Sequence, residues 1–370
     1  MDQKLNHEEI GLEISQLDRS RWHYPACAII LTHHNYSELV GDCLLSLVDQ
    51  TYPNWECVVV DDNSTEDERN RLQGVIEQFS NPRIRLIQNA QQLGQVGAFF
   101  AGLAASHGEF VSPLDPDDRL DPIYLEEMVR AHLNDTVFCP IVSCEQRLLR
   151  LGSGLITGTY KGRLRWRAHE LEHPVRIDIS TPDDPLLYFS GTKRGWVWTS
   201  TSSLMVRRLA TKFLVPNKPL GYNCLDSYLA FGAHFLGGTL IVQKPLVYRG
   251  IHTDNDYLED DLFSMTHQRQ AREDAPHMTP QCRRDVVEAL FHNGVTSVVG
   301  PGRLAKLLQA HFDEKEITLL GAVCPEAYEI WQRHKDRKPA KPIFMRRLLS
   351  RRRKPAKEDD DIPPHGHELK

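Results

Sequence analysis

Two groups of acidic side chains stand at the ends of apolar segments, where carboxylates can bind cations or hydroxyl groups. Asp61 and Asp62 follow the apolar segment 56–60, and three further aspartates follow the segment 109–114, namely Asp115, Asp117 and Asp118. Like charges held this close together are unfavourable unless a cation or protons neutralise them. Because hard oxygen ligands suit Mg²⁺ or Mn²⁺, the second group predicts a divalent-metal site.

Helix capping is the competing interpretation of both acidic groups. Thr65 and Glu68 have the spacing of a capping box, but such a box leaves the aspartate pair at 61–62 unexplained. The Asp-Pro pair at 121–122 would already supply the cap and the first residue of the following helix. Capping therefore leaves the upstream acids of both groups available for ligands.

A third acidic candidate is Asp226, at the start of a helix expected at about 224–235. The backbone dipole favours an anionic side chain in the first helical turn, and such a carboxylate can act as a general base. In the alternative interpretation, Asn223 caps the helix and Asp226 stands at the third helical position. Because one residue can fill both roles, the alternative does not exclude the catalytic one.

The elements that must position these residues follow from the apolar pattern. Residues 26–143 alternate strand-like and helix-like segments with short connections, which is typical of a Rossmann-like, mostly parallel sheet flanked by helices. The segment 56–60 is almost continuously apolar, as expected for a strand covered on both faces. In open sheets of this kind, ligands bind at the carboxyl ends of the strands. We therefore expect an α/β fold that gathers the acidic groups at one edge.

Composition and charge limit the remaining choices. The chain has 370 residues, 41% hydrophobic content, a formal net charge of -6 and eight cysteines. The charge gives no general attraction to nucleic acid, and no CxxC pair suggests a zinc site, so we expect buried thiols in a cytoplasmic protein. We predict a polar extension at 1–24, a main domain at 25–255, a helical accessory region at 256–340 and a disordered tail at 341–370.

The segments 29–65 and 92–122 together resemble the nucleotide-binding half of family 2 glycosyltransferases, which have the GT-A fold. The resemblance covers 25–143 strongly and 190–255 more loosely, so it divides the main domain into a nucleotide-binding half, 25–143, and an acceptor half, 144–255. It implies donor contacts from the residues after the first strand, from the acid pair after the second and from the later acidic group: Thr32, His34, Asn35, Asp61, Asp62, Asp115 and Asp117. It also implies that Asp117 and Asp118 bind the metal.

Four further expectations come from the acceptor half and from the stretch 94–102. Family members carry a Glu-Asp pair whose aspartate is catalytic, and Asp226 stands at the matching place after a leucine. His252 matches a histidine that can lie near the metal, or is an ordinary loop residue. Trp196 and Trp198 stack on acceptor sugars, or pack beneath a loop. Where many members have Ala-Arg-Asn, this chain has Ala-Phe-Phe at 98–100 and lacks the usual arginine contact to the donor phosphates.

The resemblance implies a metal-dependent, inverting glycosyltransferase of the hexosyltransferase type, with Mg²⁺ or Mn²⁺ as cofactor. Its donor would be a nucleotide sugar, with a UDP-sugar favoured, and its acceptor a carbohydrate or lipid-linked hydroxyl in polysaccharide or glycoconjugate synthesis. A catalytically inactive nucleotide-sugar-binding module is one alternative. A sugar nucleotidyltransferase is another, but it needs a glycine-rich phosphate loop where this chain has THHNY at 32–36. The basic run 346–353 suits either anionic lipid at the inner face of the membrane or a solvated tail.

Overall fold

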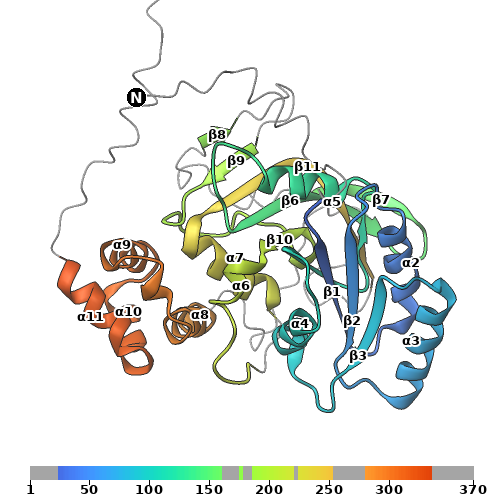
Figure 1. Ribbon diagram of the computed structural model, residues 1–370, viewed down its shortest axis with the longest axis horizontal. Helices are drawn as coiled ribbons and strands as arrows, with labels where there is room; N and C mark the ends of the chain where they lie inside the picture. Colours follow the sequence, from blue (N-terminus) through green and yellow to red (C-terminus); the bar gives the residue numbers. More distant parts are fainter. Residues whose placement is uncertain (1–23, 161–174, 178–185, 221–223, 253–279, 336–370) are drawn as a thin grey trace, which may run out of the picture. The chain divides into compact units, whose positions relative to one another are not determined.

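The computed structural model describes residues 24–160, 175–177, 186–220, 224–252 and 280–335 (Figure 1). The described residues up to His334 belong to one compact unit. Most of the predicted extension at 1–24, the predicted tail at 341–370 and the basic run 346–353 lie outside the described residues. Within the described ranges, no helix is both long enough and apolar enough to cross a membrane.

The first part of the sheet is parallel, as predicted. Its strands have the order β3-β2-β1-β4 and the bounds Ile84–Gln88, Trp55–Asp61, Cys27–His33 and Phe110–Leu114. The connecting helices are α2 (Ser37–Val48), α3 (Glu66–Phe79) and α4 (Gly94–Ala104). Figure 1 shows α2 and α3 on one face of these strands and α4 on the other.

Alternation along β1 explains how this sheet is covered on both faces. Ile29 and Leu31 lie in one hydrophobic core with Leu44 of α2, whereas Ile30 lies in a second core with Phe99 of α4. All five side chains are completely buried. Successive residues of a strand point to opposite faces, so an uninterrupted apolar strand stabilises both helical layers at once.

The second part of the sheet contains both parallel and antiparallel pairs. β10 (Leu204–Arg207) runs antiparallel to β4 and to β6 (Ile141–Arg150), and β11 (Thr239–Ile251) runs parallel to β6. Four short strands complete the sheet: β5 (Arg119–Leu120), β7 (Leu155–Tyr160), β8 (Val175–Ile177) and β9 (Leu186–Phe189). The predicted α/β class, with a sheet flanked by helices, is confirmed.

The helical C-terminal region packs against the sheet domain through α7 (Leu225–Gly237). The remaining helices are α5 (Tyr124–His132), α6 (Arg208–Thr211), α8 (Pro280–His292), α9 (Pro301–His311), α10 (Glu314–Val323) and α11 (Pro325–His334), with short 3-10 turns η4 (Thr201–Ser203) and η5 (Val295–Ser297). Tyr228 of α7 and Leu290 of α8 share one core. A Cβ on Gly232 would lie 2.4 Å from Leu214, so glycine allows this close approach. The eight cysteines are buried free thiols, as predicted.

Two buried histidines lie where α7 approaches α9. His234 contacts the Thr239 hydroxyl through Nδ1 (2.9 Å) and the Lys193 carbonyl through Nε2 (3.1 Å). Burial, together with the charge of nearby His311, lowers the pKa of His234 to about 3. Burial also lowers the pKa of His311 to about 4. Both rings are therefore neutral in the folded protein near neutral pH.

The neutral state of His234 predicts acid-dependent loss of stability. Because the folded-state pKa lies below the unfolded value of ~6.5, the stabilisation is present above that pH and is lost as the pH falls toward the folded-state pKa. Between about pH 7.5 and about pH 5, the wild type should lose about 2 kcal/mol more unfolding free energy than His234→Asn. Urea unfolding at both pH values measures this difference. The exposed His292, changed to Asn, is the control and should keep the full wild-type pH dependence; equal pH dependence in His234→Asn would contradict the prediction.

Candidate functional site

A cavity of about 330 Å³ opens at the carboxyl ends of β1, β2 and β4. Its walls come from the turn after β1, the start of α4, the loop after β4, the start of α7 and the end of β11. The lining residues include most of the predicted site: Thr32, His34, Asp62, Asp115, Asp117, Asp226 and His252. Segments that are far apart in the sequence thus meet in one cavity at the predicted edge of the sheet.

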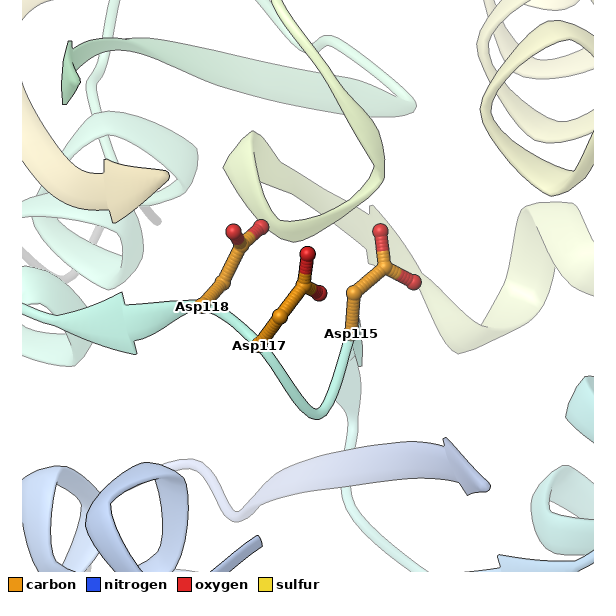
Figure 2. Close-up of side chains that lie close together, drawn as sticks. All are labelled: Asp115, Asp117 and Asp118. Carbon is orange, nitrogen blue, oxygen red and sulfur yellow. The ribbon is translucent and has the colours of Figure 1, made fainter. Parts of the chain in front are cut away.

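The acidic loop between β4 and β5 forms a tight cluster. Oxygen atoms of Asp115, Asp117 and Asp118 all lie within 4.8 Å of one another. Figure 2 shows the three carboxyl groups projecting from this loop toward the same side. Carboxylates at this spacing can share one divalent cation.

Contacts with β11 and with η4 hold this loop in place. The Asp118 carboxylate accepts a hydrogen bond from the Gly250 backbone N–H (2.9 Å), and the Asp115 backbone N–H donates to the Ser202 hydroxyl (3.0 Å). A Cβ on residue 250 would lie 2.2 Å from the Asp117 carbonyl oxygen. Glycine at that position therefore lets β11 press directly against the acidic loop.

The electrostatics of the cluster fit a bound cation. Burial, followed by the charge of Asp117, raises the pKa of Asp118 to about 7, although the Gly250 N–H and the Arg249 charge act in the opposite direction. Burial and the neighbouring carboxylates also raise the pKa of Asp115 well above its usual range. A divalent cation would offset this excess of negative charge, and oxygen ligands are those that Mg²⁺ and Mn²⁺ prefer.

His252 lies beside the same cluster, at the end of β11. Its Nε2 atom is 3.4 Å from Oδ2 of Asp117. The ring is therefore within reach of a cation held by the aspartates, and its proposed ligand role is compatible with this position.

Asp61 and Asp62 differ in their surroundings although both are buried. Asp62 accepts hydrogen bonds from the backbone N–H groups of Leu93 (2.9 Å) and Gly94 (2.8 Å) and from the Asn89 side chain (2.8 Å). It thus attaches the end of β2 to the start of α4, and it also lines the cavity. Asp61 is completely buried, pairs with Nδ1 of His33 at 3.1 Å, and is absent from the cavity wall.

The turn after β1 is held by its own polar side chains. Asn35 has φ 59° and accepts a hydrogen bond from the Thr65 N–H (3.0 Å), so it joins the turns after β1 and β2 without lining the cavity. Nε2 of His33 accepts the Tyr36 N–H (3.1 Å), which leaves the ring proton on Nδ1 toward Asp61. Burial lowers the pKa of His33. Thr32, His33, His34 and Tyr36 then face the cavity.

Asp226 lies in the first turn of α7 and lines the same cavity as the acidic loop. Its Oδ1 accepts a hydrogen bond from the Ser227 N–H (2.6 Å), and Cys224, not Asp226, stands at the cap position. The alternative cap, Asn223, lies outside the described residues. Gln95 connects the acidic loop with the start of α7: Nε2 donates to Asp115 (2.8 Å), and Oε1 accepts the Leu225 N–H (3.3 Å).

The two tryptophans do not line this cavity. Trp198 is 1% exposed, its Nε1 donates to the Thr239 hydroxyl (3.1 Å), and its ring lies 5.2 Å from that of Trp196. Trp198 instead lines a different cavity, beside Phe231 and His234, and its burial favours the packing alternative; its acceptor contact stays a prediction. Trp196 is partly buried against the same core, and its acceptor contact stays a prediction.

Polar lining residues that the sequence prediction did not include are Gln92, Gln95, Arg249, His33, Tyr36, Ser200 and Thr201. Arg249 lies on β11 two residues from Ile251, and its charge acts on Asp115 and Asp118. Phe99, where many family members have arginine, is completely buried in the core. Gln95 is a polar residue in the first turn of α4, and that position was the sequence signal that could have identified it.

Comparison with known proteins agrees with this site. Residues 28–177 match the family model described as glycosyl transferase family 2. An uncharacterized glycosyltransferase of Nostoc sp. is 28% identical over 249 residues, which cover 67% of this chain and 71% of that protein. The UDP-Glc:alpha-D-GlcNAc-diphosphoundecaprenol beta-1,3-glucosyltransferase WfgD of Escherichia coli is 34% identical over 91 residues, 25% of this chain and 34% of WfgD.

A solved structure with some likeness is the mannosyltransferase PcManGT from Pyrobaculum calidifontis in complex with GDP-Man and Mn²⁺. It has 14% sequence identity and a TM-score of 0.46, over 89% of this chain and 79% of that one. The family match begins within β1 and includes both acidic groups of the cavity. Residues 28–177 are therefore similar to glycosyl transferase family 2, and the matched part of the chain is similar to the Nostoc glycosyltransferase.

Proposed function

We propose that this protein is a metal-dependent, inverting hexosyltransferase that moves a sugar from a nucleoside-diphosphate sugar to an acceptor hydroxyl. The observation that carries this proposal is the meeting of the acidic cluster and Asp226 in one cavity at the carboxyl ends of the strands. A cation site and a separate carboxylate in one cavity suit a displacement in which the diphosphate departs while the acceptor hydroxyl attacks.

The donor nucleotide would lie against the turns after β1 and β2. Thr32, His34 and Asp62 line the cavity and would face the nucleotide, whereas Asp115 and Asp117 would face the ribose and diphosphate. Asp61 and Asn35 would act through the turns that they hold. A UDP-sugar donor and a lipid-linked or carbohydrate acceptor are supported by the name of WfgD, which states both substrate classes for that protein.

Asp117 and Asp118, together with His252, would hold Mg²⁺ or Mn²⁺. The bound cation supplies a Lewis acid that stabilises negative charge on the departing nucleoside diphosphate. The chain's own contribution is to keep these ligands fixed through the contact of Gly250 with the acidic loop and to surround them with a partly closed wall.

Asp226 would act as the general base. Its carboxylate takes the proton of the acceptor hydroxyl as that oxygen forms a bond to the anomeric carbon. The bond from the anomeric carbon to the diphosphate oxygen breaks in the same step, with inversion at that carbon. Gln95 would keep the base and the donor side at a fixed separation through its two hydrogen bonds.

A screen of UDP-, GDP- and dTDP-sugars with Mn²⁺, Mg²⁺ or EDTA tests this function. We expect one nucleotide to raise the melting temperature only with a divalent cation, slow release of the free nucleoside diphosphate, and an inverted anomeric configuration in the NMR spectrum of the product. Binding without hydrolysis or transfer would favour the inactive binding module. Formation of a nucleotide sugar from a nucleoside triphosphate and a sugar phosphate would favour the nucleotidyltransferase.

A further inference from the structure

The cavity carries far more negative than positive charge. Carboxyl groups of Asp62, Asp115, Asp117 and Asp226 line it, whereas Arg249 is the single arginine or lysine among its described lining residues. A diphosphate is itself anionic, so a cavity of this composition needs cationic groups wherever the phosphates bind. One divalent cation would offset part of this charge, and Arg249 is the protein's own contribution.

The position of Arg249 follows from the sheet. β11 pairs with β6 in parallel, with Arg249 opposite Leu148, and the next residue, Gly250, donates its N–H to Asp118. Arg249 is half-buried and lines the same cavity as Asp115 and Asp117. Because the neighbouring Gly250 contacts the acidic loop directly, Arg249 is positioned beside that loop.

The guanidinium of Arg249 is available to a ligand. Within the described part of the chain, no hydrogen bond or ion pair within 4.0 Å joins this side chain to another residue. A guanidinium carries five N–H donors, and holding them partly away from water without partners is unfavourable. A planar fork of donors matches the oxygen atoms of a phosphate group.

No side chain at positions 98–100 of α4 supplies the positive charge that a diphosphate needs. Phe99 is completely buried, and the ring centroid of Phe100 lies 6.2 Å from that of Tyr228, so both side chains serve the packing between α4 and α7. Ala98 faces the cavity from the same helix with no charge. The positive charge that a diphosphate requires must therefore come from another wall.

We propose that Arg249 binds the diphosphate group of the donor and of the released nucleoside diphosphate, next to the cation held by the acidic loop. This inference rests on the proposed function, because it needs a diphosphate in the cavity. In this proposal, the arginine that contacts the diphosphate lies on β11 and not on α4. Arg249 thus discriminates a nucleoside diphosphate from an uncharged nucleoside.

Titration calorimetry with UDP, GDP, dTDP and uridine at a fixed Mn²⁺ concentration tests the assignment. We expect Arg249→Gln to weaken binding of the preferred diphosphate by roughly 10- to 100-fold, the range of a lost charge-assisted hydrogen-bond pair. Uridine binding should change less than about 2-fold, and Arg249→Lys should be intermediate because it keeps the charge without the fork. Arg71→Gln, at an exposed position on α3, is the matched control and should bind like the wild type.

A purely structural role for Arg249, as a counter-charge to the acidic loop, predicts different results. Removing the counter-charge would then affect binding of uridine and of the diphosphate equally. Equal affinities of the wild type and Arg249→Gln for the diphosphate, or parallel losses for uridine, overturn this inference and leave the proposed function standing. If the wild type binds none of UDP, GDP and dTDP with Mn²⁺, the proposed function fails together with the inference.

Discussion

Asp226→Asn is expected to lower the rate of sugar transfer by about 10²- to 10⁴-fold while the Kd for the donor stays near its wild-type value. Asparagine has the same shape but cannot take a proton from the acceptor hydroxyl. Its amide oxygen can still accept the Ser227 N–H, so the first turn of α7 should remain intact. Turnover and affinity should therefore separate in this variant.

The measurement combines steady-state kinetics with calorimetric titration of the donor. Asp67→Asn is the matched control, because Asp67 also lies in the first turn of a helix, α3, but is exposed and outside the cavity wall. The control should keep both kcat and Kd. Loss of donor affinity in proportion to the loss of turnover would instead make Asp226 a structural residue of the helix start.

Asp118→Asn should remove the metal dependence of nucleotide binding. A neutral amide replaces one carboxylate of the cluster, so the Kd of the nucleotide in Mn²⁺ should rise by about 10²-fold or more, since even indirect partners of metal ligands contribute 10- to 100-fold. Asparagine retains an oxygen that can accept the Gly250 N–H, which should preserve the loop.

The stability of the metal-free protein should not be weakened by Asp118→Asn, although nucleotide binding is. The pKa of Asp118 is raised to about 7 in the folded protein, so this group stabilises the fold at low pH and the stabilisation is lost as the pH rises through about 7. Without metal, Asp118→Asn should therefore melt no lower than the wild type at about pH 8. Mn²⁺ should raise the melting temperature of the wild type and leave that of the variant unchanged.

Calorimetry and thermal unfolding with Mn²⁺ or EDTA test both parts. The exposed Asp135, changed to Asn, is the control for loss of one surface charge and should retain the full effect of Mn²⁺. A Mn²⁺-dependent nucleotide titration that is the same in Asp118→Asn and in the wild type would reject Asp118 as a metal ligand.

The parallel half of the sheet could be predicted because its signals are local. The predicted strand 56–60 is β2, Trp55–Asp61, and the apolar helix after the first strand is α2, Ser37–Val48. A strand that packs on both faces has few polar positions along its length, so its pattern can be recognised without knowledge of its partners. The acids that follow such strands then fall at the ligand-binding edge.

The caps could not be predicted in the same way because distant partners compete for the side chains. α5 begins at Tyr124 with Ile123 as its cap residue, and the Asp121 carboxylate is shared between the Ile123 N–H (3.4 Å) and Arg147 of β6 (3.2 Å). The capping box at Thr65 is half formed. The Thr65 hydroxyl accepts the Glu68 N–H, but the Glu68 carboxylate accepts the N–H of Ser37 in α2 (3.0 Å).

The same reason explains which site residues escaped prediction. The role of Gln95 depends on its hydrogen bonds to Asp115 and to Leu225, and Leu225 lies 130 positions later in the chain. Arg249 has no adjacent charged residue in the sequence that would indicate a binding site. Its role depends on the acidic loop, which packs against Gly250 in the folded protein. Local patterns identify residue types at strand ends, whereas partners supplied by other elements require the folded arrangement.

The cavity is built from distant segments of the chain, so the N-terminal part of the chain cannot form it alone. The family match ends at residue 177, and it therefore contains the acidic loop but none of Asp226, Arg249 and His252. A truncated protein that stops there would present the loop without β11, the strand that presses against Asp117 and donates to Asp118. Such a fragment would expose unsupported carboxylates to water, so neither nucleotide capture nor turnover should be sought in it.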